Sequence, residues 1–151
     1  MLKPGDSAPD FSLPDHRGGE TSLNDLLQAG PLVLYFYPAD FTPVCTQEAC
    51  MFRDVHDEIV QAGLAIAGVS PQSVESHARF AEKIRAPFPL LADAEKAVIK
   101  RYGANGPFGF GVRRVTYLIR PDKEIADAVR ADLGVARHRA FIRAAIDAAS
   151  V

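Results

Sequence analysis

The chain has very little cysteine: Cys45 and Cys50 are the two cysteines among 151 residues. In a reducing compartment two neighbouring cysteines are more often catalytic or metal-binding than structural. Two thiols with no second matched pair make a poor zinc site, so the catalytic interpretation is favoured. The segment around this pair is therefore the candidate catalytic segment of the chain.

Neither sign of charge dominates the chain. Lys and Arg total 17 against 19 acidic residues, a net charge of −2, so nothing indicates nucleic acid or an anionic membrane as a partner. No apolar run approaches the ~20 residues that a bilayer-spanning helix needs. Residues 1–6 also lack the apolar core of a secretory signal. We therefore expect a cytoplasmic location.

The chain also lacks repeats, low-complexity tracts and any linker long enough to separate domains. Its length is usual for one domain and a hydrophobic content of 48% suffices for a core, so residues 1–151 are expected to form a single domain. The glycine-rich segment 103–111 lacks the lysine of a phosphate loop. The histidines show no metal-ligand spacing with the cysteines and are expected at the surface: His16, His56, His77 and His138.

Apolar runs alternate with helical periodicity along the chain and predict an α/β protein. Strands are expected near residues 10–13, 19–22, 32–37, 64–69, 88–91, 115–119 and 125–129, the last two forming a hairpin. Helices are expected near 22–27, from about 43 to 63, from the cap Ser70 and Pro71 to about 85, and near 94–101 and 136–149. This order suits a central mixed sheet with helices on both faces.

The cysteines directly follow the expected buried strand at 32–37. Thr42 has a hydroxyl of the kind that caps helices, and Pro43 stands where a first helical residue is expected. Cys45 is then the third residue of a helix, in the turn where unpaired N–H groups and the helix dipole favour an anion. A thiol there loses its proton easily, and the thiolate is the form that attacks. Cys45 is thus a candidate nucleophile.

Pro38, Thr42 and Cys45 fill the pattern Pro-x-x-x-Thr-x-x-Cys. Together with the string Thr-x-Glu-Ala-Cys that ends at Cys50, this segment resembles the active site of the peroxiredoxins, in particular the bacterioferritin comigratory protein or PrxQ branch. The resemblance covers nearly the whole chain, because further segments match in order: Asp10-Phe-Ser-Leu-Pro-Asp15, Phe88-Pro-Leu-Leu-Ala-Asp93 and Arg114-Val-Thr-Tyr-Leu-Ile119. The chain departs from many relatives at positions that carry no reacting group: Ala39, Val44 and 120–123.

The resemblance implies a thioredoxin-like fold with the N-terminal extension of the peroxiredoxins. It implies a thiol-dependent peroxidase that reduces hydrogen peroxide or an organic hydroperoxide through a sulfenate on Cys45. It also implies recycling by an external dithiol protein such as thioredoxin, without metal, haem, flavin or another cofactor. This branch is often monomeric but includes dimers, so a monomer or weak homodimer is expected.

Placement of the peroxide and stabilisation of the leaving oxygen must supply most of the acceleration. Thr42 is expected to cap the Cys45 N–H or to donate toward a bound oxygen, unless it is an ordinary N-cap residue. Arg114 can stabilise both the thiolate and the leaving oxygen, unless it faces solvent. Arg113 is the rival, because neighbours on a strand point in opposite directions. The family register selects Arg114.

Two further residues have weaker assignments. Pro38 is expected to shield the sulfur from water by its shape, with a plain turn proline as the alternative reading. Glu48 lies one helical turn beyond Cys45. It either orients an arginine or is a solvated acid on the helix surface.

Cys50 cannot reach Cys45 while their common helix stays wound. Five residues along a helix give a Cα separation of roughly 8.6 Å, beyond the ~7 Å limit for a disulfide. The hypothesis is that a Cys45 sulfenic acid forms, the first helical turns unwind, and Cys50 condenses with it. The resemblance supports this resolving role, because many relatives carry their second cysteine at this spacing. The alternative is that Cys50 is a small core residue.

Two other functions use the same cysteines. A thioredoxin-like disulfide reductase is disfavoured, because that chemistry normally has two residues between the cysteines and this chain has four. A peroxide-sensing relay that oxidises a partner through a mixed disulfide is barely separable from a peroxidase by sequence. A third possibility, a cysteine hydrolase, would need a histidine beside Cys45, and nothing in the sequence indicates one.

Overall fold

The structure is a computed structural model that describes residues 1–149. Every expected strand and helix is present. Within the described residues, no helix combines the length and the apolar character needed to cross a membrane. The elements follow in the order β1 (Ser12–Pro14), β2 (Glu20–Ser22), α1 (Leu23–Leu27), β3 (Leu32–Phe36), α2 (Pro43–Asp54), α3 (His56–Gln61), β4 (Ala65–Ser70), α4 (Val74–Ile84), β5 (Leu90–Ala92), α5 (Ala97–Arg101), a 3₁₀ turn (Pro107–Gly109), β6 (Val115–Ile119), β7 (Ile125–Arg130) and α6 (Ala136–Ala149).

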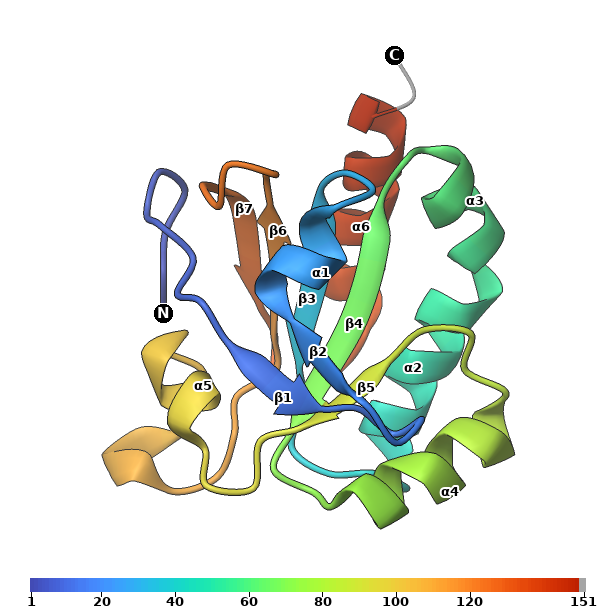
Figure 1. The fold of residues 1–151 in the computed structure, drawn as a ribbon, viewed down its shortest axis with the longest axis vertical. Helices are drawn as coiled ribbons and strands as arrows, with labels where there is room; N and C mark the ends of the chain where they lie inside the picture. Colours follow the sequence, from blue (N-terminus) through green and yellow to red (C-terminus); the bar gives the residue numbers. More distant parts are fainter. Residues whose placement is uncertain (150–151) are drawn as a thin grey trace.

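Five strands form one mixed sheet in the order β5-β4-β3-β6-β7 (Figure 1). β3, β4 and β5 run parallel, whereas β6 is antiparallel to β3, and β7 to β6. The β1–β2 hairpin is separate from this sheet and reaches β5 through a bridge between Asp15 and Leu91. The prediction of a central mixed sheet with an N-terminal extension is confirmed.

β3 occupies the centre of the sheet and is buried on both faces. Leu32, Leu34 and Phe36 pack on one face, while Val33 and Tyr35 pack on the other, because side chains alternate along a strand. All five are at most 1% exposed. Such a double burial requires the continuous apolar run seen in the sequence. The segment that leaves β3 toward α2 therefore starts from a fixed point.

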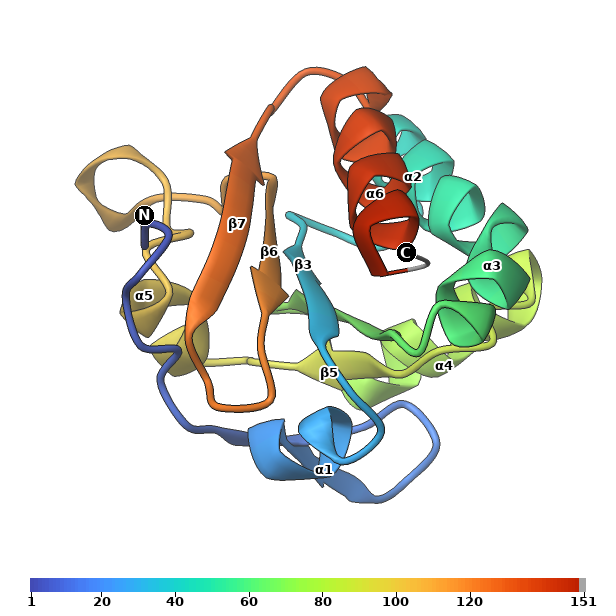
Figure 2. The same ribbon diagram turned by 90° about the horizontal axis from the view of Figure 1, so that it is seen from above.

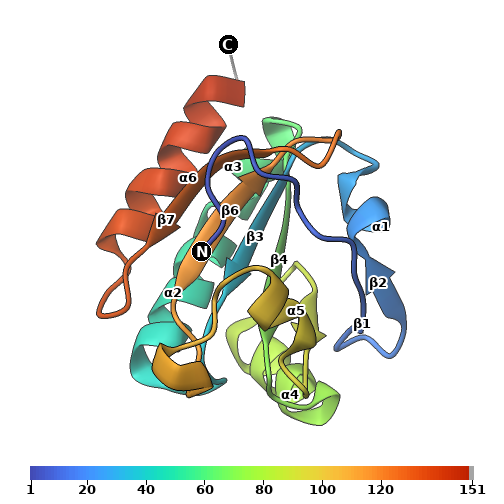
Figure 3. The same cartoon turned by 90° about the vertical axis from the view of Figure 1, so that its left-hand side faces the viewer.

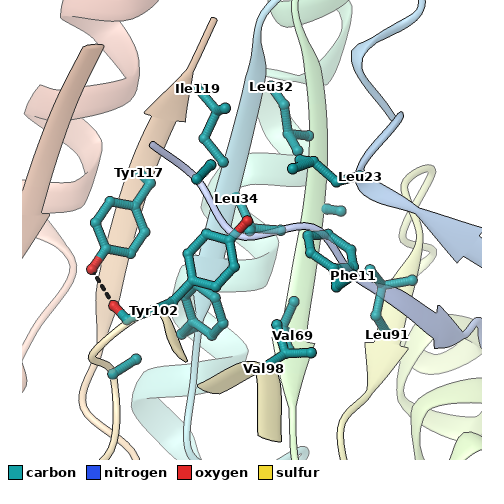
Figure 4. Packing of buried hydrophobic residues seen from close by; sticks show 14 of the residues in the cluster. Phe11, Leu23, Leu32, Leu34, Val69, Leu91, Val98, Tyr102, Tyr117 and Ile119 are labelled. Carbon is teal, nitrogen blue, oxygen red and sulfur yellow. Dashed lines mark hydrogen bonds between the residues drawn. The ribbon is translucent and has the colours of Figure 1, made fainter. Parts of the chain in front are cut away.

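Helices cover both faces of the sheet (Figure 2). On one face α1, α5 and the N-terminal segment pack around Phe11 and Tyr102, and Tyr117 donates its hydroxyl hydrogen to the Tyr102 carbonyl (Figure 4). On the other face lie α2, α3, α4 and α6, with Cys45 and Phe52 of α2 in the shared core. Figure 3 shows α1 and α6 on opposite sides of the sheet.

A close approach between β3 and β4 fixes the position of Tyr35. A Cβ atom on Gly68 would lie 2.7 Å from Cζ and 2.9 Å from Oη of Tyr35. On its other side the Tyr35 ring packs against Phe52 of α2, with 4.7 Å between ring centroids. Because Gly68 has no side chain, the Tyr35 ring fits between β4 and α2.

The helix that carries the cysteines is shorter than expected. The sequence predicts one helix to about residue 63, whereas α2 ends at Asp54 and α3 begins at His56. The interruption lies at Val55, with φ −103° and ψ 9°. Neither proline nor glycine marks this position, so helical periodicity alone does not reveal it.

The predicted cap of the next helix is wrong. Ser70 is the last residue of β4, and its hydroxyl accepts a hydrogen bond from the Gln72 N–H in the following turn. The cap of α4 is Ser73, whose Oγ accepts the Ser76 N–H at 3.1 Å. A serine that is paired in a strand cannot also begin a helix, and this pairing moves the start of α4 along the chain.

Candidate active site

Cys45 lies where the sequence predicts it, as the third residue of α2. Thr42 is the N-cap residue, with an extended backbone (φ −76°, ψ 151°), and Pro43 is the first helical residue. The Cys45 side chain is 1% exposed and belongs to the core between α2 and the sheet. The sulfur is thus held at a helix N-terminus in a nearly dry environment, where a nearby positive charge acts strongly on it.

The Thr42 side chain does not make the expected cap. Its hydroxyl donates to the Ala39 carbonyl oxygen at 2.9 Å and makes no hydrogen bond to the first turn of α2. The Thr42 carbonyl instead accepts the N–H and the hydroxyl of Thr46, at 2.9 and 2.7 Å. The tight turn before α2 brings the Ala39 carbonyl closer to the hydroxyl than the helix amides. The other expected role of Thr42, donation toward a bound oxygen, stays a prediction.

Arg114 is the cation that contacts the sulfur. Its Nη1 and Nη2 each donate toward the Cys45 Sγ at 3.4 Å, and the residue is 4% exposed. It immediately precedes β6, the neighbour of β3, and its N–H is anchored by the Asp132 carboxylate at 2.9 Å. Burial alone would lower the pKa of Arg114, but the charge of Glu48 and the Cys45 contact raise it above its ordinary value. The guanidinium therefore stays charged beside the sulfur.

Arg113, the rival arginine, points elsewhere. Its Nη1 lies 3.6 Å from the Asp132 carboxylate, and 28% of its side chain is exposed. Both arginines precede β6, and their side chains reach different partners. Of the two arginines, Arg114 is therefore the one that lies against the Cys45 sulfur, and it does not face solvent. Its role in the reaction stays a prediction.

Glu48 orients Arg114 rather than facing solvent. Its Oε1 accepts a hydrogen bond from the Arg114 Nη1 at 2.9 Å, and the residue is 0% exposed. Burial raises the pKa of Glu48 to about 7, against the lowering effect of the Arg114 charge and hydrogen bond. Its Oε2 has no hydrogen-bond partner among residues 1–149 and lies 3.6 Å from the His138 Nδ1.

His138 completes this buried group and was missed by sequence reasoning. It is 0% exposed, and burial lowers its pKa. Its Nδ1 lies 2.8 Å from the Thr116 Oγ1, and its Nε2 lies 3.0 Å from the Ala131 carbonyl oxygen. The signal was present, because His138 precedes Phe141, Ile142 and Ala145 at the helical spacing of the buried face of α6.

The expectation of surface histidines is wrong more generally. His77 is also 0% exposed, whereas His16 and His56 are partly buried. His16 is fixed by the Leu90 N–H, which donates to its Nδ1 at 3.0 Å. A polar side chain can lie in a core where it has hydrogen-bond partners, and here a partner comes from a segment far along the chain that sequence alone does not reveal.

Glu48 makes the stability of the fold dependent on pH. The folded state binds the Glu48 proton more tightly than the unfolded chain, so the free energy of unfolding falls as pH rises from 4.5 to about 7. The total loss is about 3 kcal/mol. Glu48→Gln is expected to remove this slope in urea unfolding between pH 4.5 and 7.5. His138 has the opposite sign, so any slope that it contributes runs against that of Glu48. Equal slopes in both would contradict the prediction.

The remaining predicted site residues are Pro38, which precedes α2, and Cys50, which lies five residues beyond Cys45 on this helix. Pro38 is partly buried at the start of the turn, and its shielding role stays a prediction. Cys50 is partly buried, and both cysteines are free thiols on the unbroken helix α2. The geometric condition stated from sequence therefore holds: a Cys45–Cys50 bond needs the helix to open.

The fold and the buried thiol–guanidinium pair define a class of thiol peroxidases with a thioredoxin-like fold. Residues 4–128 match the family model described as AhpC/TSA family. The chain therefore belongs to the AhpC/TSA family.

Within this family the chain is a peroxiredoxin of the Bcp/PrxQ branch. It is 41% identical over 130 residues to peroxiredoxin Bcp of Escherichia coli K12, which covers 82% of this chain and 83% of that protein. Peroxidoxin BcpB of Mycobacterium tuberculosis has a similar crystal structure, with a TM-score of 0.91 and 38% identity over 98% of both chains. The bacterioferritin comigratory protein of Xanthomonas campestris has a TM-score of 0.84 and 32% identity, covering 98% of this chain and 96% of that one. The resemblance inferred from sequence is confirmed, and the chain is a peroxidase.

Proposed function

We propose that this peroxidase is an atypical 2-Cys peroxiredoxin in which Cys45 is the peroxidatic cysteine and Cys50 the resolving one. The observation that carries the proposal is the paired contact of the Arg114 guanidinium with the Cys45 sulfur, 3.4 Å from each terminal nitrogen. A buried cation at this distance favours the anionic sulfur and is available to a second anion formed beside it.

In the first step the Cys45 thiolate attacks the near oxygen of the peroxide. The O–O bond breaks, the sulfur gains a hydroxyl group and becomes a sulfenic acid, and the departing oxygen takes up a proton to give water or an alcohol. Arg114 stabilises the charge on the departing oxygen, and Glu48 keeps the guanidinium in place. Thr42 and Pro38 position the peroxide at the N-terminal end of α2.

In the second step the Cys50 thiol attacks the sulfenic sulfur, the S–S bond forms and water leaves. Both cysteines lie on α2, so its first turns must unwind before the sulfurs meet. The partly buried position of Cys50 supports this step, because the thiol is near the surface that opens. A dithiol protein, thioredoxin in our proposal, then reduces the disulfide.

The substrates proposed are hydrogen peroxide and organic hydroperoxides. The Xanthomonas campestris bacterioferritin comigratory protein has alkyl peroxide reduction activity, which supports the second class. The balanced charge of the chain gives no reason for a nucleic-acid or membrane partner, and we propose a monomeric or weakly dimeric protein that acts in the cytoplasm without a cofactor.

One equivalent of hydrogen peroxide is expected to convert the reduced protein into a form with an intramolecular Cys45–Cys50 disulfide. Mass spectrometry after thiol alkylation should show the loss of two hydrogens and no alkylated cysteine. Cys50→Ser is the matched control, and it should hold a Cys45 sulfenate that dimedone traps. An unlinked Cys50 beside a stable Cys45 sulfenate in the unsubstituted protein would reject the resolving role.

The reductant is tested separately with the oxidised protein. Thioredoxin and its reductase should support continuous NADPH consumption with peroxide, and Cys50→Ser should lower the steady rate while keeping the first turnover. Turnover with glutathione alone at the same rate would contradict the assignment of thioredoxin. Stable mixed disulfides with another protein, formed faster than thioredoxin reduces the enzyme, would favour the relay function instead.

A further inference from the structure

The segment 38–42, which joins β3 to α2, contains a strained residue. Phe41 has φ 66°, in the left-handed region that a bulky side chain rarely adopts. Such a conformation is costly and persists only where surrounding contacts over-determine it. These contacts matter for the active site, because Pro38 and Thr42 lie at the two ends of the same segment.

The Asp40 carboxylate is the first of these contacts. It is 5% exposed and accepts hydrogen bonds from the Tyr37 hydroxyl at 2.7 Å and the Ser76 hydroxyl at 2.7 Å. The His77 Nδ1 lies 2.7 Å from the same carboxylate. Burial alone would raise the pKa of Asp40, but the hydrogen bond and charge of His77, with the hydroxyls of Tyr37 and Ser76, lower it. The carboxylate is therefore held as an anion.

His77 connects this carboxylate to the body of the protein. It lies on α4, is 0% exposed, and has its Nε2 3.1 Å from the Leu91 carbonyl oxygen of β5. Each ring nitrogen therefore faces an oxygen that can accept a hydrogen bond. The pair Asp40–His77 thus ties the segment 38–42 to α4 and β5 through buried hydrogen bonds, and the charge of the Asp40 carboxylate strengthens the first of them.

A second contact with α4 is made by the strained residue itself. The Phe41 ring packs edge-on against Phe80, with 5.2 Å between centroids, and the Lys83 Nζ lies 5.7 Å from the Phe41 centroid. One helix therefore holds the segment at two successive residues. This double attachment is the over-determination that the backbone of Phe41 requires.

We propose that His77 is a positioning residue for the chemistry of Cys45, acting through Asp40 on the segment 38–42. While the Asp40–His77 pair is intact, it fixes Thr42 at the start of α2 and keeps the first helical turn wound. When the pair is broken, the strain at Phe41 is released and this turn opens. The inference rests on the proposed two-cysteine cycle and assigns to α4 the control of its two steps.

The two steps should respond to His77 in opposite directions. Attack on the peroxide needs Pro38 and Thr42 fixed, so a loosened segment slows sulfenic acid formation. Condensation of Cys50 with the sulfenic acid needs an open turn, so the same loosening speeds disulfide formation. A faster second step leaves less time for another peroxide to oxidise the sulfenic acid to sulfinic acid, with loss of water or alcohol.

His77→Gln and His77→Asn form a matched pair of variants for the test. The Gln amide nitrogen occupies the place of Nε2, so it keeps the donor to Leu91 and loses the donor to Asp40. The Asn amide nitrogen occupies the place of Nδ1 and keeps the donor to Asp40. In stopped-flow experiments His77→Gln should slow the peroxide step by about 10–100-fold. It should also accelerate disulfide formation and lower the sulfinate yield at excess peroxide, whereas His77→Asn should stay close to wild type in all three.

Amide hydrogen exchange and a variant with a smaller expected effect provide two further tests of the role of His77. The Thr46 amide, bonded to the Thr42 carbonyl at 2.9 Å, should exchange faster in His77→Gln than in His77→Asn. If His77→Gln does not fold, Ser76→Ala removes one donor to Asp40 and should give the same directions with smaller, roughly 2–5-fold changes. Equal changes in both His77 variants, or both steps slowed together, would overturn the proposal. If no disulfide forms even in wild type, the two-cysteine cycle fails, while the peroxide rate and Thr46 exchange still decide the role of His77.

Discussion

Replacing Cys45 by serine is expected to reduce peroxide consumption to the rate of a protein-free solution. A serine hydroxyl is not ionised near neutral pH and cannot replace the thiolate as the attacking atom. Enzymes typically accelerate reactions by about 10⁶-fold or more, and all of this depends here on one sulfur. The measurement is the loss of peroxide in single turnover, without thioredoxin, so that reductant recognition does not enter.

Two controls accompany Cys45→Ser. Circular dichroism and urea unfolding should show that the variant folds, because serine fills nearly the same volume in the core. Cys50→Ser should consume one equivalent of peroxide at the wild-type rate, since Cys50 acts after the first step in the proposed cycle. Undiminished peroxide consumption by a folded Cys45→Ser protein would remove the basis of the whole assignment.

Arg114→Lys is expected to lower the rate of the peroxide step by about 10²–10³-fold, the usual cost of losing one preorganised donor to a developing charge. Lysine keeps the positive charge but not the planar fork, which here contacts the Cys45 sulfur through two nitrogens and Glu48 through one of them. A single ammonium cannot satisfy both groups in the same geometry. The measurement is the second-order rate constant for hydrogen peroxide in stopped flow, with the free energy of unfolding measured in parallel.

Arg113→Lys is the matched control for Arg114→Lys. Arg113 is the neighbouring residue, partly exposed and paired with Asp132, so the exchange leaves the thiol untouched. It should change the rate by less than about twofold, as expected for a surface ion pair. Similar losses in both variants would mean that the loop before β6, rather than the guanidinium fork of Arg114, matters for the reaction.

The architecture and the position of the candidate nucleophile could be predicted from sequence because their signals are local. The apolar run at 32–37 defines a strand buried on both faces, and the order Thr42, Pro43, Cys45 defines a helix start with the thiol in its first turn. The register of Arg114 came from the resemblance rather than from physical reasoning. The structure adds the distances from the Arg114 guanidinium to the Cys45 sulfur.

The polar residues behind the sulfur could not be predicted in the same way. Glu48 had two open readings, and His77 and His138 were expected at the surface, yet all three are 0% exposed. Their burial depends on partners far along the chain, such as Arg114 for Glu48 and Asp40 for His77. A single sequence gives the residue types but not these pairings. The hydroxyl of Thr42 shows the same limit at short range, since the choice between two nearby acceptors depends on the turn geometry.

The fit between Gly68 and Tyr35 has a consequence for how such proteins can diverge. Any larger residue at Gly68 would push the tyrosine toward Phe52 and so into the helix that carries the thiol. Substitution at one of these two places is therefore tolerated only with a compensating change at the other. Homologues with a bulkier residue at the position of Gly68 should carry a smaller one at the position of Tyr35. Covariation of these two positions would show that the packing beneath the active-site helix is maintained in the family.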